Sequence, residues 1–259
     1  MEKNIKLIIA YDGTDFCGWQ RQADLSHGKN SGSAVRTVQG EIENALEKIH
    51  GKHLNLTGAG RTDSGVHAAG QAANFYTDIE SMPPERFTPA LNSILSHEIR
   101  ILESCEVNND FHARFSAKKR LYRYYFLYRN VKPHEYRYNL QLRRFPRIDL
   151  LNAYSRLILG ETDCSIFAGA GDSAVIKGKS KNRYIYRSCF FVEDNRLVFE
   201  ICANAFLRNM VRSVAGTFLH YEESGTQPDD LKKIIASGKR SLAGPTLPAQ
   251  GLFLWKVEY

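Results

Sequence analysis

The sequence predicts an α+β fold built from two similar-sized halves. The order strand, helix, strands, helix, strand occurs twice along the chain with variations, and the second occurrence contains a hairpin. Too few segments have helical periodicity for a doubly wound parallel sheet. We place the boundary between residues 113 and 114, which gives halves of 1–113 and 114–259.

In the first half, residues 3–11 alternate between apolar and polar side chains and are expected to form a strand. Residues 37–50 place apolar side chains on one helical face, with Thr37 suited to cap the helix and Gly51 to end it. The other expected elements are a polar surface loop over 22–36, strands over 54–56, 71–76 and 98–107, and a helix from 83 to 95.

The second half begins with a tyrosine-rich strand over 119–129. A helix is expected from Asp149, as its cap, to residue 159, and a long helix over 204–221. A hairpin is expected across Asp194 and Asn195. The remaining expected elements are the hairpin strands 184–193 and 196–202, a short helix over 228–236 and a closing strand over 252–259.

Composition excludes several classes of protein. The 259 residues are 43% hydrophobic and 24% charged, with 35 basic and 28 acidic side chains and a net charge of +7. This is typical of a globular protein and not of a disordered or collagen-like chain. No transmembrane segment or signal peptide is expected. The five cysteines contain no C-x-x-C pair, which argues against disulfides and structural zinc and favours the cytoplasm.

Residues 58–70 are the most unusual stretch, because four glycines among thirteen residues indicate a tight, irregular backbone. Arg61, Asp63 and His67 lie within it. One interpretation is a turn in which Asp63 caps local amides. The other is a loop that presents Arg61 and Asp63 to a ligand.

Basic and aromatic side chains alternate over residues 118–126. On a strand, Tyr122, Tyr124 and Phe126 share one face, while Arg123 and Tyr125 share the other. This pattern fits a core strand with a solvated basic face. It equally fits a surface where bases stack on tyrosine and phosphates meet cations.

Arg208 and Arg212 lie one turn apart on the expected long helix. Either both extend to solvent, or one of them pairs with a buried carboxylate. The eight histidines do not suggest a metal site, and phosphate-binding glycine loops and a serine-nucleophile motif are not found. We therefore expect no metal and no cofactor.

A series of motifs runs through the chain in a fixed order: residues 11–20 (YDGTxFxGWQ), 37–40 (TVQG), 60–68 (GRTDSGVHA), 110–116 (DFHARFS), 122–124 (YRY), 203–212 (ANAFLRNMVR) and 248–252 (PAQGL). On these motifs the sequence resembles the bacterial tRNA pseudouridine synthase A family, nearly from end to end. The resemblance implies a cofactor-free isomerase that converts uridine to pseudouridine at positions 38, 39 and 40 of the tRNA anticodon stem-loop. It also implies two α+β halves with antiparallel sheets flanking a basic central cleft, and a homodimer that binds the tRNA.

The resemblance assigns roles to five residues. Asp63, on a loop of the first half, matches the family's essential aspartate and is expected to be the nucleophile. The chemistry allows its carboxylate to add to the sugar or to the base, or to remove a proton. Arg212 matches the arginine that pairs with Asp63. Tyr122 matches a tyrosine that packs on the target base. Arg61 matches an arginine that helps to displace the target nucleotide, and Leu252 matches an apolar residue that lines the pocket.

Two segments, 25–36 and 169–179, are longer than is usual in that family. They affect the expected choice of uridine and not the chemistry. The alternatives are a synthase with a different target uridine, a tRNA-binding chaperone relative without catalysis, and an enzyme acting on a small phosphorylated metabolite.

Overall fold

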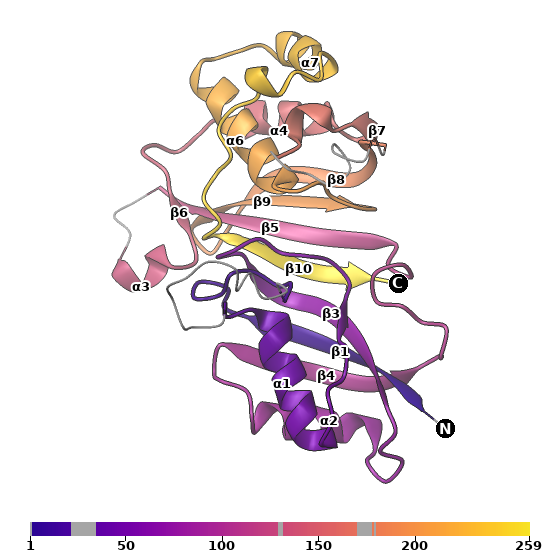
Figure 1. The fold of residues 1–259 in the computed structure, drawn as a ribbon. Coiled ribbons are helices and arrows are strands. Elements are labelled where there is room, and N and C mark those ends of the chain that lie inside the picture. Colours follow the sequence, from indigo (N-terminus) through magenta and orange to yellow (C-terminus); the bar gives the residue numbers. More distant parts are fainter. Residues whose placement is uncertain (1, 22–34, 129–131, 170–177, 179) are drawn as a thin grey trace, which may run out of the picture. The chain divides into compact units, whose positions relative to one another are not determined.

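A computed structural model describes residues 2–21, 35–128, 132–169, 178 and 180–259. These residues form a mixed α and β structure with two compact units (Figure 1). The first unit comprises Met1–Lys118 and Leu254–Tyr259, and the second comprises Lys119–Phe253. Nearly all of the expected loop 22–36, and most of segment 169–179, lie outside the described residues.

Within the first unit the strands of the sheet follow the order β4-β1-β3-β10, with a short β2 paired to β3. Of β10, only the residues from Leu254 onward belong to this unit. β1 pairs antiparallel with both β3 and β4, and a register shift near its end aligns Tyr11 with Ala68. The strands are β1 (Lys3–Tyr11), β2 (Thr57–Gly58), β3 (His67–Thr77), β4 (Ile99–Val107) and β10 (Leu252–Glu258). This pairing places the chain that follows β1 beside the start of β3.

Helix α1 (Val38–His50) forms where the periodicity predicts it. The Thr37 hydroxyl accepts a hydrogen bond from Gly40 N, and Gly51 ends the helix with a left-handed φ of 69°. The core of this unit includes an edge-to-face contact between Phe75 and Phe87, whose ring centroids are 5.3 Å apart.

Two expectations for the first half are wrong in detail. Residues 54–56 are not a strand, because the backbone of Leu56 bonds to side chains of α1: its N–H donates to Glu43 and its carbonyl accepts from Gln39. The expected helix 83–95 is a single 3₁₀ turn, η1 (Pro84–Arg86), followed by α2 (Phe87–Asn92). Asn92 exchanges two hydrogen bonds with the backbone of Ile101, which fixes the end of α2 against β4.

The sheet of the second unit has the order β5-β9-β8-β7, and β6 pairs with β5 in parallel. The sheet is therefore mixed and not wholly antiparallel. Its strands are β5 (Lys119–Leu127), β6 (Leu140–Gln141), β7 (Gly160–Asp163), β8 (Asn182–Glu193) and β9 (Arg196–Ala203). The β8–β9 hairpin is confirmed, and Asp194 and Asn195 both have positive φ, as a type I′ turn requires.

Helices pack on one face of β8 and β9 in the second unit (Figure 1). Phe190 stacks on Phe199 at 4.6 Å, and Phe218 lies across Phe199 at 6.3 Å. The helical segments are α3 (Pro133–Tyr136), α4 (Ile148–Arg156), η2 (Ser165–Phe167), α6 (Met210–Glu223), α7 (Pro228–Ala236) and η3 (Arg240–Leu242).

Two helix starts in the second half differ from the expectation. Asp149 lies inside the first turn of α4 and does not cap it; Glu222 of α6 accepts a hydrogen bond from Arg147 N instead. The long helix begins at Met210 and not at residue 204, because Asn209 adopts a left-handed conformation with a φ of 61°. Arg208 therefore precedes α6 and is not one helical turn from Arg212.

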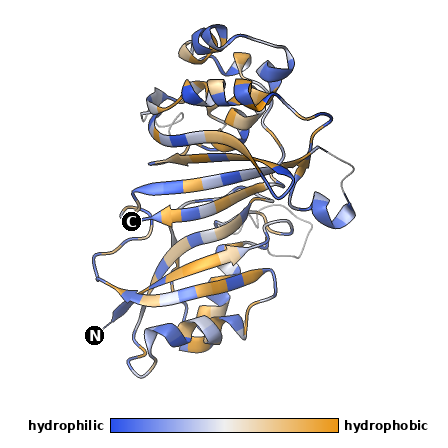
Figure 2. Ribbon diagram, turned by 180° about the vertical axis from the view of Figure 1, so that it is seen from behind, coloured by the Kyte–Doolittle hydropathy of each residue, from blue (hydrophilic) through white to orange (hydrophobic). Residues whose placement is uncertain are grey.

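Figure 2 shows hydrophobic residues along the strands of both units, interrupted by hydrophilic ones. Within the described part of the chain, the helices are too short or too polar to cross a lipid bilayer.

Candidate active site

The glycine-rich loop that carries Asp63 connects β2 to β3 in the first unit. Asp63 is half-buried, and its carbonyl accepts a hydrogen bond of 3.1 Å from Val66 N. Gly65 has a φ of 76°, which favours glycine at that point of the turn. The neighbouring Thr62 is buried, and its hydroxyl lies 2.7 Å from that of Tyr11. The backbone around Asp63 is thus fixed on both sides.

A second segment, residues 12–20, packs directly against this loop. Trp19 N donates to the carbonyl of Thr62 at 3.1 Å, and Gly65 N donates to that of Phe16 at 3.4 Å. Gly18 has a φ of 92°, and a Cβ there would lie 2.6 Å from Thr62 O and 3.1 Å from the carbonyl carbon of Asp63. Only glycine allows this approach of two backbones.

His67 joins the same two segments from inside the unit. Its side chain is fully buried, and its Nδ1 accepts a hydrogen bond of 3.0 Å from Gly13 N. Nδ1 also lies 3.2 Å from Asp12 Oδ1, which accepts hydrogen bonds from the backbone and the hydroxyl of Thr14. His67 is therefore a structural part of the loop, placed by β3 beside the turn that follows β1.

Arg61 lies on the outer side of the loop and is exposed to solvent. Its Nε donates to Gln20 Oε1 at 3.1 Å, and Gln20 in turn donates to Gln39 of α1 at 2.7 Å. This chain of amides anchors the base of the Arg61 guanidinium to the body of the unit.

Tyr122 lies on β5 in the second unit, opposite Ile201 of β9. It is 8% exposed, and its ring meets that of Phe206 edge to face at 5.0 Å. Arg123, on the other face of β5, donates to Glu200 at 2.7 Å, so this face carries ion pairs.

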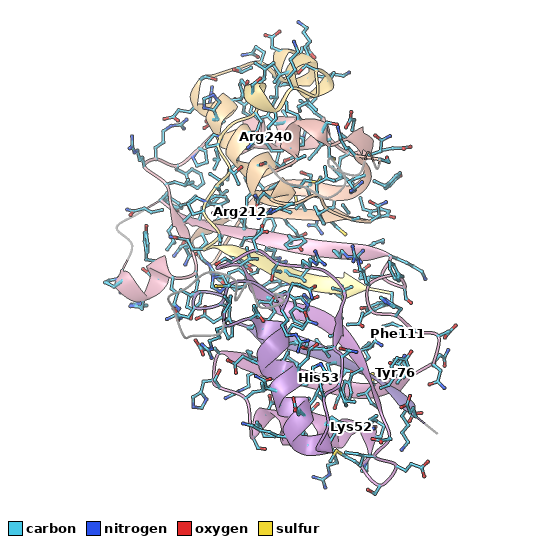
Figure 3. The ribbon with its side chains drawn as sticks, viewed as in Figure 1. Lys52, His53, Tyr76, Phe111, Arg212 and Arg240 are labelled. Carbon is cyan, nitrogen blue, oxygen red and sulfur yellow. The ribbon has the colours of Figure 1, made fainter. Side chains whose placement is uncertain are left out.

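Arg212 lies in the first turn of α6, where Figure 3 labels it. Its Nε donates to the carbonyl of Leu247 at 2.6 Å, and one terminal nitrogen donates to Asn209 Oδ1 at 3.0 Å. Asn209, whose left-handed conformation starts the helix, thus also orients the guanidinium.

Segment 247–252 connects Arg212 to the strand of Tyr122. The carbonyl of Pro248 accepts a hydrogen bond of 2.6 Å from the hydroxyl of Tyr124, and Tyr125 N donates to Gly251 O at 2.9 Å. Burial raises the pKa of Tyr124 far above its ordinary value, so the hydroxyl stays a donor. Leu252 ends the segment and is 4% exposed.

The predicted site residues therefore fall into two groups. Asp63 and Arg61 share one loop of the first unit, whereas Tyr122, Arg212 and Leu252 are connected within the second. The sequence alone does not predict that Gly13, Gly18 and Trp19 hold the Asp63 loop, although two glycines shortly after β1 are a signal of close backbone packing. Within the described residues, no group of three or more His, Cys, Asp or Glu side chains is arranged to hold a metal ion.

The sequence of the chain, compared with known proteins, places it in a class of RNA-modifying enzymes. The model of the tRNA pseudouridine synthase family matches residues 7–116 and 155–259, so the chain belongs to that family and is an isomerase acting on tRNA. Among its relatives is a tRNA pseudouridine synthase A of Treponema denticola, 51% identical over the whole chain and 93% of the relative. The enzyme of that name from Treponema pallidum is 47% identical over 94% of this chain and 84% of its own. That of Caldicellulosiruptor saccharolyticus is 40% identical over 99% of this chain and its own full length.

Proposed function

We propose that this enzyme isomerises uridine to pseudouridine at positions 38, 39 and 40 of the tRNA anticodon stem-loop, with Asp63 as nucleophile. The observation that carries this proposal is the Asp63 loop, held against residues 12–20 in a chain that matches tRNA pseudouridine synthases over nearly its full length. A nucleophile has to be held in a fixed position to act efficiently.

The reaction needs only rearrangement within the nucleotide. The bond between C1′ and N1 of uracil breaks, the base turns, and a bond forms between C1′ and C5. The proton lost from C5 is balanced by the proton gained at N1, so no oxidant or reductant is consumed. In our proposal the Asp63 carboxylate adds covalently to the substrate and leaves again when the new bond forms.

Arg212 is proposed as the ion-pair partner of Asp63. Its hydrogen bonds to Leu247 and Asn209 support this role, because they fix the plane of the guanidinium. Tyr122 is proposed to pack on the target base, with Phe206 limiting the freedom of its ring. Leu252 is proposed to line the pocket, where apolar walls strengthen electrostatic interactions.

Arg61 is proposed to help displace the target nucleotide from the stacked stem. Its exposure and its anchor on Gln20 support that role. Chemistry at C1′ of a stacked base requires the nucleotide to leave the helix.

We further propose that the halves 1–113 and 114–259 flank a basic cleft for the anticodon arm. The first half carries the Asp63 loop and the second completes the cleft. The enzyme is proposed to work in the cytoplasm as a homodimer.

The test is chemical mapping of pseudouridine in undermodified tRNA with the wild type and Asp63→Asn in parallel. The proposal expects product at positions 38–40 with the wild type alone, and equal tRNA binding by both proteins. Product at other uridines would indicate a different target. Near wild-type turnover by Asp63→Asn would remove Asp63 from the mechanism.

A further inference from the structure

The aromatic ring of Phe115 is unusually exposed to solvent for an apolar side chain. The phenyl side chain is 77% exposed, more than any other large hydrophobic residue among those described. It lies in the first unit, just after Phe111, which Figure 3 labels. Leaving an apolar ring in water forgoes the stabilisation that its burial would bring.

The backbone beneath Phe115 is nevertheless well fixed. Ser116 N donates to the carbonyl of His112 at 2.9 Å, and His112 N donates to the hydroxyl of Ser116 at 3.1 Å. His112 Nδ1 accepts from Arg114 N at 3.2 Å and from Phe115 N at 3.3 Å. Residues 112–116 therefore form a closed turn.

The turn is also attached to the body of its unit. Ala113 is fully buried, its N–H donates to Asn74 of β3 at 2.9 Å, and its carbonyl accepts from the hydroxyl of Tyr259 at 2.9 Å. The exposed ring thus extends from a rigid support and not from a loose end.

The neighbours of the ring are those of a nucleotide-binding surface. The imidazole of His112 lies 4.3 Å from the phenyl centroid with an interplanar angle of 31°, and the guanidinium of Arg114 lies 5.8 Å away. Arg114 and Lys118 are both exposed. An exposed aromatic ring beside cations suits a base next to a phosphate, and not the apolar surface of another protein.

A hollow of about 370 Å³ lies at the same turn. Its lining includes Ser116, Phe111, Asn108 and Asp110, together with Val107. Amide and carboxylate oxygens accept hydrogen bonds from base amino groups. The hollow therefore offers polar partners for a base edge at the turn that carries Phe115.

We propose that Phe115 is a stacking platform for an unpaired base of the tRNA, and that Arg114 contacts an adjoining phosphate. This proposal rests on the proposed function, since it takes tRNA as the substrate. Phe115 would act in binding and not in chemistry.

The experiment compares Phe115→Ala, Phe115→Trp and Arg114→Gln with the wild type, using undermodified tRNA transcript as the probe. Leu102→Ala is the control. Leu102 is also an exposed apolar residue of the same unit, at 54% exposure, but its neighbour is the acidic Glu103 and not a cation that could meet a phosphate. Affinity is measured over a range of salt concentrations, and kcat and KM for pseudouridine formation are measured with each protein.

Phe115→Ala removes the ring on which the base would stack, and tRNA binding should therefore weaken about ten-fold or more. KM should rise with kcat little changed, and the salt dependence should keep its slope. Phe115→Trp should retain affinity, and its added indole should be quenched by tRNA beyond the quenching of the two native tryptophans. The logarithm of the tRNA binding constant falls linearly with the logarithm of the salt concentration. Arg114→Gln should make this slope less steep by about one, as the loss of one phosphate contact does.

Equal affinity and equal KM in Phe115→Ala and the wild type would overturn the proposal, provided that the wild type forms pseudouridine. A fall in oligomer mass with unchanged affinity per subunit would overturn it in favour of contact with a second copy. If the wild type formed no pseudouridine at all, the proposed function would fail instead, and the binding comparison would still decide whether Phe115 stacks on RNA.

Discussion

A Cβ atom on Gly13 would lie 2.0 Å from the carbonyl oxygen of Val66. Gly13 belongs to the turn after β1, and Val66 closes the loop that carries Asp63. The position of the proposed nucleophile, Asp63, thus depends on the absence of a side chain at Gly13, fifty positions earlier in the sequence.

We predict that Gly13→Ala lowers pseudouridine formation strongly and also lowers the melting temperature. The added methyl group forces the two backbone segments apart and breaks the hydrogen bond from Gly13 N to His67 Nδ1. A buried polar group left without its partner lowers the free energy of unfolding by about 1–3 kcal/mol. Gly40→Ala is the matched control, since its Cβ would be 3.0 Å from the Thr37 hydroxyl, a side-chain atom. Thermal melts and single-turnover assays of both variants provide the measurement, and similar behaviour of the two would contradict the prediction.

In this protein the sequence predicts the structure that neighbouring residues determine. It predicts less well the tertiary contacts that override local preferences. The strand β1, the capped helix α1 and the type I′ hairpin depend on neighbouring residues, and all three are confirmed. The start of α6 was not predictable from periodicity, because Asn209 leaves the helical conformation. The carbonyl of the preceding Arg208 bonds instead to Gly169 N.

The same distinction holds for the candidate site. The density of glycines around Asp63 predicts an irregular loop, as observed. How that loop is held depends on Gly18 and His67, whose partners lie on other segments of the first unit. The pairing of Asp63 with Arg212 stays a prediction, derived from resemblance.

Arg212→Lys should slow turnover although it keeps the positive charge. A lysine has no planar fork with which to bond Leu247 O and Asn209 Oδ1 together while facing a carboxylate. We expect kcat to fall on the order of a hundred-fold, as when an oriented electrostatic group is lost, with tRNA affinity retained. Turnover of the prebound complex checks this, and a variant with wild-type kcat would exclude Arg212 as the partner of Asp63.

Cysteine reactivity should follow burial. Burial raises the pKa of the Cys164 thiol from 9.0 to about 12, and its side chain has no exposed surface, whereas Cys17 is exposed. Because the thiolate is the reactive form, an alkylating reagent should modify Cys17 in the native protein and leave Cys164 unmodified. Peptide mass spectrometry before and after unfolding in urea tests this order, and early labelling of Cys164 would show that its surroundings open in the native state.

Glu222 should make the stability of the protein depend on pH. Its carboxylate is 2% exposed and bonds to Arg144 at 2.7 Å and to Arg147 at 3.1 Å. Burial alone would raise the pKa of Glu222, but the hydrogen bonds from the two arginines and from Arg147 N outweigh it. The pKa therefore lies below its ordinary value of 4.5.

A carboxyl with a lowered pKa in the folded state stabilises the protein above its ordinary pKa. That contribution is lost as the pH falls through the lower folded value. Glu222→Gln should therefore reduce the free energy of unfolding near neutral pH. The loss should be about 1–2 kcal/mol, less than for a fully buried pair, because Arg144 and Arg147 remain half-exposed to water.

The difference between wild type and Glu222→Gln should hold from pH 7 to about pH 5 and narrow toward pH 3, as the wild type loses its carboxylate. Urea unfolding of both proteins across this range measures it. Glu223→Gln, which changes the neighbouring exposed carboxylate, is the control and should differ little from the wild type at any of these pH values. A difference that widened toward acid pH would mean that Glu222 is protonated more readily in the folded protein than in the unfolded chain, contrary to the arrangement of its arginines.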